Sequence, residues 1–226
     1  HHHLHHLDLD GNCLRKNGCV ALSTLLQCSA IVLQYLNLSN NEIGDDGVEA
    51  LVPALPNCIC LRKLWMCNNR SITTRGWQSL ASILESPNSN LKELGIQFNN
   101  VDDEAMTAFA NALVNNRTLQ TLRLRDNLST ITVIGWGTFS KVLCNTSSVN
   151  STFLSNHTLL YMGDEMDGNA IIEPLLDLNE RNNKKEIAMI KILKSHEDFD
   201  MQPFFEWEFK VLPLVLSWLE RASEYD

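Results

Sequence analysis

A nine-residue pattern recurs through the first 160 residues and constrains the fold more than any other feature of the sequence. It reads Leu-x-x-Leu-x-(Leu/Met/Ile)-x-x-Asn, and successive copies start 29, 28, 30 and 28 residues apart. The five clear copies occupy residues 4–12, 33–41, 61–69, 91–99 and 119–127. A degenerate sixth copy is expected at 149–157, with His157 in place of the asparagine. A unit this short cannot bury its apolar side chains alone, so the copies are expected to stack on one another.

A second motif follows each copy at a fixed distance. It begins with a small residue and carries apolar residues four and eight positions later, a spacing that places them on one face of a helix. Each unit is therefore predicted to be a short strand, a turn and a helix. The asparagine that ends each copy is expected to bond backbone groups of the turn and to form a ladder along the stack. The ladder residues are Asn12, Asn41, Asn69, Asn99 and Asn127.

Together the two motifs resemble the leucine-rich-repeat proteins of the ribonuclease-inhibitor type, over residues 4–160. The resemblance implies an α/β fold: a curved solenoid with parallel strands on its concave face and helices on its convex face. Proteins of this type commonly bind other proteins on the concave face, so the resemblance also implies protein binding there. We expect residues 1–160 to form this solenoid, with about five full repeats and the degenerate sixth. Because the chain begins inside a repeat, we also expect preceding repeats in a longer protein.

Residues 161–226 differ in character and are expected to form a helical, acidic, aromatic-rich cap on the end of the solenoid. They carry 7 basic and 15 acidic residues, whereas residues 1–160 carry 11 and 12. Helices are predicted at 168–181 and 183–195. The aromatic stretch 198–222 is interpreted as part of the cap, with an exposed aromatic docking surface as the alternative. This aromatic stretch also resembles the tails of leucine-rich-repeat proteins predicted in diatoms.

The outward-facing strand positions predict a binding surface. Parallel strands lie about 4.8 Å apart, so equivalent positions of successive repeats form columns, and the middle units place basic and aromatic side chains there. Aromatic and arginine residues commonly anchor protein interfaces, and we therefore predict that this group binds another protein with an acidic surface. Its members are Tyr35, Arg62, Lys63, Trp65, Lys92, Arg123 and Arg125. A solvated face without a partner, or contact with the protein's own acidic tail, are the alternatives.

The sequence holds no constellation typical of an enzyme. A Gly-rich phosphate loop, a His-Glu-x-x-His motif and a Cys-x-x-Cys pair are all missing, so we predict no catalytic activity, no cofactor and no metal site. The main alternative is a GTPase-activating protein of the Ran type, which shares the solenoid and assists another protein's phosphoryl transfer. Arg15, Arg70 and Arg75 on the strand-to-helix loops are the candidate arginines for that activity. A structural subunit of a larger assembly is the third alternative.

The composition argues against some classes of binding partner and indicates a cellular compartment. The net charge of −9 argues against general nucleic-acid binding, and no apolar run approaches the roughly 18 residues needed to span a membrane. Seven cysteines without disulfide or zinc spacing suggest a reducing compartment, and we predict a cytoplasmic protein. The sequons at Asn69 and Asn127 fall on the ladder and are expected to be inaccessible to glycosylation. His5 and His6 belong to the first copy, whereas the preceding three histidines are interpreted as an expression tag.

Overall fold

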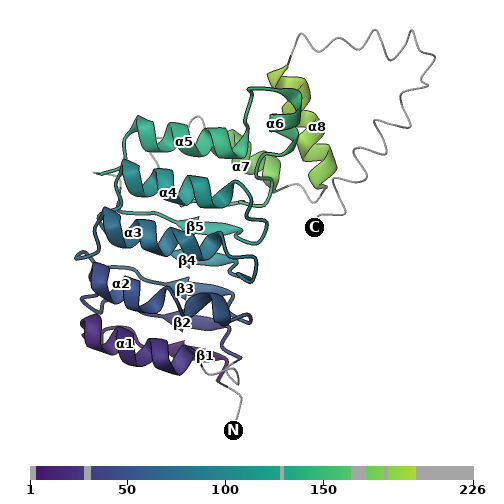
Figure 1. The fold of residues 1–226 in the computed structure, drawn as a ribbon. Helices are drawn as coiled ribbons and strands as arrows, with labels where there is room; N and C mark the ends of the chain where they lie inside the picture. The colour runs from purple at the N-terminus through teal and green to yellow at the C-terminus, as the bar shows by residue number, and fades with distance from the viewer. Residues whose placement is uncertain (1–3, 28–31, 128–129, 164–171, 181–182, 197–226) are drawn as a thin grey trace, which may run out of the picture.

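Five short parallel strands form one sheet whose strand order follows the chain. The computed structural model describes residues 4–27, 32–127, 130–163, 172–180 and 183–196. Figure 1 shows the strands in one layer and a row of helices in a second layer beside it. The strands are β1 (His6–Asp8), β2 (Tyr35–Asn37), β3 (Lys63–Trp65), β4 (Glu93–Gly95) and β5 (Thr121–Arg123).

One helix follows each of these strands, as the two linked motifs predict. The helices are α1 (Arg15–Leu26), α2 (Asp45–Leu51), α3 (Thr74–Ala81), α4 (Asp103–Leu113) and α5 (Val133–Leu143). Short 3-10 turns, η1 (Leu55–Asn57) and η2 (Ser82–Leu84), extend the helical layer after α2 and α3. The predicted α/β leucine-rich-repeat solenoid is confirmed by this alternation.

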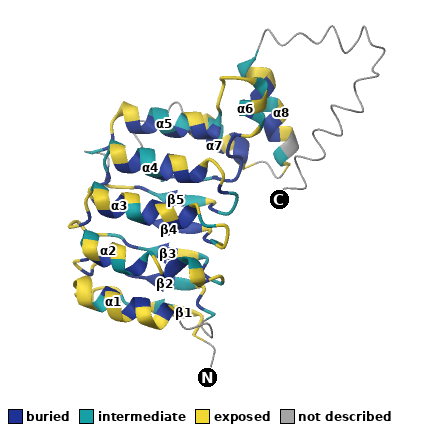
Figure 2. Ribbon diagram, viewed as in Figure 1, coloured by how far each residue is buried: buried dark blue, intermediate teal, exposed yellow. Residues whose placement is uncertain are grey.

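The core lies between the two layers. The register pairs the central leucines of the strands with one another, and Leu36, Leu64, Leu94 and Leu122 are all 0% exposed. From the helical side, the large rings of Trp77, Phe109 and Phe139 fill the same space and are equally buried. Figure 2 shows buried residues recurring along each helix of the row, with exposed residues between them. Stacking therefore buries apolar surface that a single repeat would expose.

The asparagine ladder joins each repeat to its neighbours. Asn41 Oδ1 accepts hydrogen bonds from the backbone N–H groups of Asn12 and Leu14 in the preceding repeat, at 2.9 and 3.2 Å. Its Nδ2 donates to the carbonyls of Leu9 and Ser39. The next ladder residues repeat the arrangement, and Asn69 and Asn127 are 0% exposed. The predicted ladder is confirmed, and these two sequons are buried in it.

A second set of contacts joins the beginnings of neighbouring helices. Asp45, in the first turn of α2, accepts hydrogen bonds through Oδ1 from the N–H groups of Thr73 and Gly76 at the start of α3. Asp103 of α4 makes the same contacts at the start of α5. Carboxylates favour helix N-termini because the first N–H groups lack partners there. The close approach also explains the small residue of the motif, because a Cβ at Gly76 would lie 2.5 Å from Asp45 Oδ1.

The sixth copy does not lie where the sequence pattern placed it. Residues Val149–Phe153 form the short helix α6, and the sixth strand position belongs to Tyr161, which makes a parallel bridge to Thr121. The turn sequence Asn-x-Thr-Leu, which precedes β5 at 116–119, recurs at 156–159. In both turns the asparagine Oδ1 accepts hydrogen bonds from the N–H groups of the threonine and the leucine. The period is lengthened to 40 residues because α6 is inserted.

Two further helices pack at the end of the sheet. Helix α7 (Glu173–Asn179) lies against α5, and α8 (Lys184–Ser195) lies against α6 and α7. Figure 1 shows α7 beside the end of α5 and α8 beside α6, to the right of the row of repeat helices. Ile172 and Leu176 join the main core, and Ile187 of α8 is also buried. These helices lie within the two predicted helical segments, whereas the aromatic stretch 198–222 lies outside the described residues.

Candidate functional site

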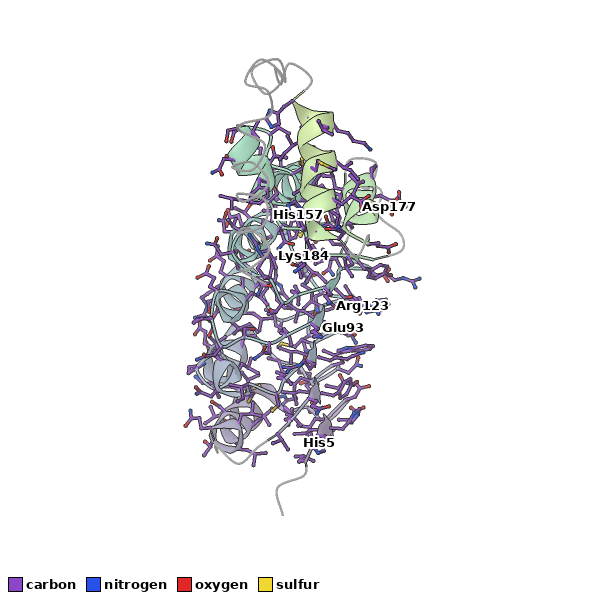
Figure 3. The ribbon with its side chains drawn as sticks, turned by 90° about the vertical axis from the view of Figure 1, so that its right-hand side faces the viewer. His5, Glu93, Arg123, His157, Asp177 and Lys184 are labelled. Atoms are coloured by element: carbon purple, nitrogen blue, oxygen red, sulfur yellow. The ribbon has the colours of Figure 1, made fainter. Side chains whose placement is uncertain are left out.

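The strand face, meaning the outward-facing side chains of β1–β5 and of the positions flanking these strands, contains the residues singled out by the sequence. The register aligns Tyr35 with Lys63 and Glu93 in one column, and Trp65 with Gly95 and Arg123 in another. Figure 3 shows side chains of this face, including Glu93 and Arg123, projecting from the sheet on the side away from the helices. The alignment of five sequence copies was thus sufficient to predict these columns.

Aromatic rings line the first three repeats of the strand face. The ring of His6 stacks on that of Tyr35 with centroids 3.9 Å apart, and the Tyr35 ring lies 6.2 Å from that of Trp65. The indole lies beside Gly95, where an added Cβ would be in ordinary contact with Trp65 Cγ at 3.5 Å. Burial raises the pKa of Tyr35, and the negative charges of Asp8 and Asp10 raise it further. Tyr35 therefore stays protonated at neutral pH.

An ion-pair network follows the aromatic rings. Glu93 is 8% exposed and lies between two cations, 2.9 Å from Lys63 Nζ and 2.7 Å from Arg123 Nε. Burial alone would raise the pKa of Glu93, but the hydrogen bonds from Lys63 and Arg123 outweigh it and hold the pKa below its usual value. The Arg123 guanidinium also lies 5.3 Å from the centroid of the Tyr161 ring. Glu93 thus compensates part of the positive charge and fixes two of the predicted residues.

The remaining three predicted cations are not held in the same way. The Arg62 guanidinium donates to the backbone carbonyls of Ile59 and Asn90, so it is engaged by loop carbonyls at the beginning of the strands. Lys92 is exposed on the face. Arg125 forms an exposed ion pair with Asp126 at 3.2 Å. The structure therefore brings Tyr35, Trp65, Lys63 and Arg123 together more closely than the other three.

A groove of about 420 Å³ runs along the side of the strand face where the strands end. Its lining residues come from the first four repeats: Asp10, Asn37, Ser39, Asn40, Trp65, Cys67, Asn68, Arg70, Gln97 and Phe98. Sequence reasoning missed Phe98, which is 42% exposed. The available signal was its position directly before the ladder asparagine, where the other repeats carry Gly11, Asn40, Asn68 and Asp126.

The arginines considered for GTPase activation have different surroundings. Arg75 is engaged by three carboxylates of α2, those of Asp45, Asp46 and Glu49, at 2.9 to 3.3 Å. Arg15 pairs with Glu42 at 2.6 Å. Both therefore tie one repeat to the next, whereas Arg70 lines the groove. Within the described ranges, no three His, Cys, Asp or Glu side chains gather as a metal site would require.

A buried polar cluster at the other end of the sheet involves His157, which is not the ladder residue that the sequence suggested. Lys191 of α8 is 1% exposed, and its Nζ donates to Leu143 O and Asn179 Oδ1, both at 2.7 Å, and to His157 Nδ1 at 3.2 Å. Burial lowers the pKa of Lys191 to about 8. Burial and the nearby ammonium lower the pKa of His157 to about 3. The cluster attaches α8 to the ends of α5 and α7.

Comparison with known proteins agrees with the repeat architecture. Residues 1–23, 30–52 and 88–110 match the family described as Leucine Rich repeat. Mouse NACHT, LRR and PYD domains-containing protein 4E is 30% identical over 162 residues, which are 71% of this chain and 16% of that protein. Mouse ribonuclease inhibitor is 38% identical over 86 residues, 36% of this chain and 18% of the inhibitor. The chain thus spans about one sixth of the length of these relatives.

Solved structures with the same fold have lower sequence identity. Leiomodin-1 Actin-Binding Site 2 superposes with a TM-score of 0.60 at 18% identity, covering 79% of this chain and 95% of that one. The tropomodulin C-terminal domain from Caenorhabditis elegans gives 0.52 at 12% identity, over 84% and 98% of the two chains. At these identities the likeness establishes the fold alone. Among the helices of the described segments, none is long and apolar enough to cross a membrane.

Proposed function

We propose that this chain, a leucine-rich-repeat protein of the ribonuclease-inhibitor type, binds an acidic surface of another protein through its strand face. The observation that carries the proposal is the charge of this face over β3, β4 and β5. The outward positions there hold five basic side chains and one acidic side chain: Arg62, Lys63, Lys92, Arg123 and Arg125 against Glu93. Charge of one sign on one face steers an oppositely charged partner and fixes its orientation.

Neighbouring aromatic groups add the apolar contact that charge alone does not provide. Trp65 and Tyr35 lie next to the basic positions, and both rings are partly exposed. Tryptophan, tyrosine and arginine are the residues that most often contribute binding energy at protein interfaces. Glu93 holds Lys63 and Arg123 in fixed positions and compensates part of their positive charge, so it limits the attraction of an acidic partner.

Charge reversal on the strand face tests this proposal. Proteins captured from an extract by the wild-type chain are compared with those captured by a Lys92→Glu/Arg125→Glu variant. The matched control is Lys141→Glu, an exposed lysine in the last turn of α5. We expect an acidic partner to be lost from the double variant, retained by the control, and released from the wild type by added salt, because exposed charge pairs are screened. Equal capture by all three proteins would contradict the proposal.

A further inference from the structure

Phe98 occupies a backbone conformation that suits it poorly. Its φ is +58°, in the left-handed region, where a side chain with a Cβ is strained. The equivalent turns have the same conformation but carry residues that tolerate it: Gly11 at +70°, Asn40 at +55°, Asn68 at +50° and Asp126 at +58°. A bulky aromatic residue in this turn is unfavourable for the fold, and its ring is 42% exposed. Strain of this kind persists most often at functional positions.

Phe98 and Trp65 both line the groove. The groove offers two aromatic surfaces together with polar groups from Asn68 and Gln97. Like Phe98, Trp65 is partly exposed. Burial of an apolar side chain against two aromatic rings is favourable. The groove therefore suits an apolar side chain that packs against Trp65 and Phe98.

The charges around the groove indicate the direction in which a bound peptide segment would run. Arg70 lines the groove together with Phe98. Phe98 N–H donates to the carbonyl of Arg125 at 3.0 Å, so a second arginine follows immediately along the sheet. Asp10 lies in the first repeat and marks the opposite end. Acidic residues are therefore favoured on the side of Arg70 and Arg125, and disfavoured on the side of Asp10.

We propose that the groove between Trp65 and Phe98 receives a bulky apolar side chain, phenylalanine or leucine, from an extended acidic segment of the partner protein. This inference rests on the proposed function, because it places the acidic segment on the same strand face. It adds an apolar anchor residue to the charge recognition and assigns Phe98 as a determinant of specificity. The acidic residues follow the anchor toward β5.

Two hexapeptides serve as probes: acetyl-Ala-Phe-Glu-Glu-Glu-Glu-amide and the same peptide with alanine in place of phenylalanine. Each is titrated into the full chain labelled with ¹⁵N, and the Trp65 indole signal is assigned from a Trp65→Phe variant. We expect both peptides to shift signals of Lys92 and Arg125. The phenylalanine peptide is expected to bind about tenfold more tightly, since burial of one large apolar side chain is of that order. It alone should shift the Trp65 indole signal.

Variants at Phe98 then test whether this residue causes the tighter binding of the phenylalanine peptide. Phe98→Asn keeps a residue suited to the turn and should bind both peptides with the affinity of the alanine peptide. Phe98→Tyr keeps the ring and should retain the tenfold difference. Val133→Asn removes an apolar side chain that is 82% exposed on α5, and should change neither affinity. Equal affinity of the wild type for the two peptides would contradict the proposal that the groove binds an apolar side chain. An equal loss of affinity for both peptides in Phe98→Asn would contradict it as well. Neither result would contradict the proposed function. If neither peptide binds, the proposed function itself fails.

Discussion

The ammonium group of Lys191 donates a hydrogen bond to Nδ1 of His157 in the interior of the protein, over 3.2 Å. This direction fixes the state of the ring. Nδ1 must be unprotonated to accept, and Nε2, 3.0 Å from Phe153 O, must therefore carry the proton. A protonated imidazole would bring two cations into contact in a site without a described carboxylate partner. The histidine is therefore neutral in the folded protein, and its neutrality makes the fold sensitive to acid.

Stability is expected to fall when the pH drops from 7 to 5. The pKa of His157 is about 3 in the fold against 6.5 as the ordinary value, so the unfolded chain takes up the proton first. The contribution of this residue is complete above pH 6.5 and is lost progressively between 6.5 and 3. At pH 5 the expected loss in the free energy of unfolding is about 2 kcal/mol, measured by urea denaturation. A His157→Gln variant should not show this loss. An equally large decrease in the variant would assign the effect to other groups.

Removal of a ladder side chain should lower the free energy of unfolding, and the decrease should be larger inside the stack than at its beginning. Asn69→Ala removes the acceptor for the N–H groups of Asn41 and Ile43, and the donor to Leu38 O and Met66 O. With several buried groups left unpaired, we expect the free energy of unfolding to fall by roughly 3 kcal/mol. Asn12→Ala is the matched control, because Asn12 is exposed and its side chain donates, within the described residues, only to Asp10 O. Chemical denaturation of both variants measures the difference, and equal effects would contradict the role of burial.

The two glycines Gly76 and Gly137 are expected to respond to alanine with opposite signs. A Cβ at Gly76 would lie 2.5 Å from Asp45 Oδ1 and 2.7 Å from Ile72 Cγ2, so Gly76→Ala must disturb the contact between α2 and α3 and lower the melting temperature. At Gly137, inside α5, a Cβ would meet nothing within 4 Å. Gly137→Ala should therefore stabilise the protein by about 0.5–1 kcal/mol, through helix propensity. Thermal unfolding compares the two, and a stabilising Gly76→Ala would refute the close contact.

Neutralising Glu93 should strengthen the binding of an acidic ligand while weakening the fold. Glu93→Gln leaves Lys63 and Arg123 without their shared carboxylate, so the strand face becomes more positive. We expect severalfold tighter binding of the acidic alanine hexapeptide at low salt, and a smaller gain at high salt. Glu42→Gln, which removes the exposed partner of Arg15, is the control and should leave this affinity unchanged. Unaltered binding by Glu93→Gln would mean that charge on this face does not control recognition.

The fold of the first five repeats was predictable from sequence because most framework residues have the same physical task in successive copies. The leucines of the inner repeats fill the core, the asparagines bond the turns, and the small residue lets neighbouring helices approach, with a carboxylate beside Gly76 and Gly135. The sixth unit lies later than the leucine pattern predicts because α6 delays the strand, and the Asn-x-Thr-Leu turn at 156–159 is the sequence signal of its true position.

The candidate site was predictable only in part. The columns follow from the repeat alignment, and Glu93 beside Lys63 follows from the same columns. The engagement of Arg62 by loop carbonyls depends on the conformation of its side chain, which spacing does not determine. The groove beside Phe98 depends on how neighbouring turns are shaped, and the sequence showed only that one turn residue differed from its equivalents.

The carboxylates that reach from one helix start to the next have a consequence for cooperativity. Asp45 belongs to one repeat but completes the hydrogen bonding of the following one, and Asp103 does the same one pair further on. A helix whose preceding repeat has unfolded loses its N-terminal acceptor at the same moment. Energetically, the second and third repeats thus form one folding pair, and the fourth and fifth form another. Opening of the second repeat would weaken the third, and opening of the fourth would weaken the fifth.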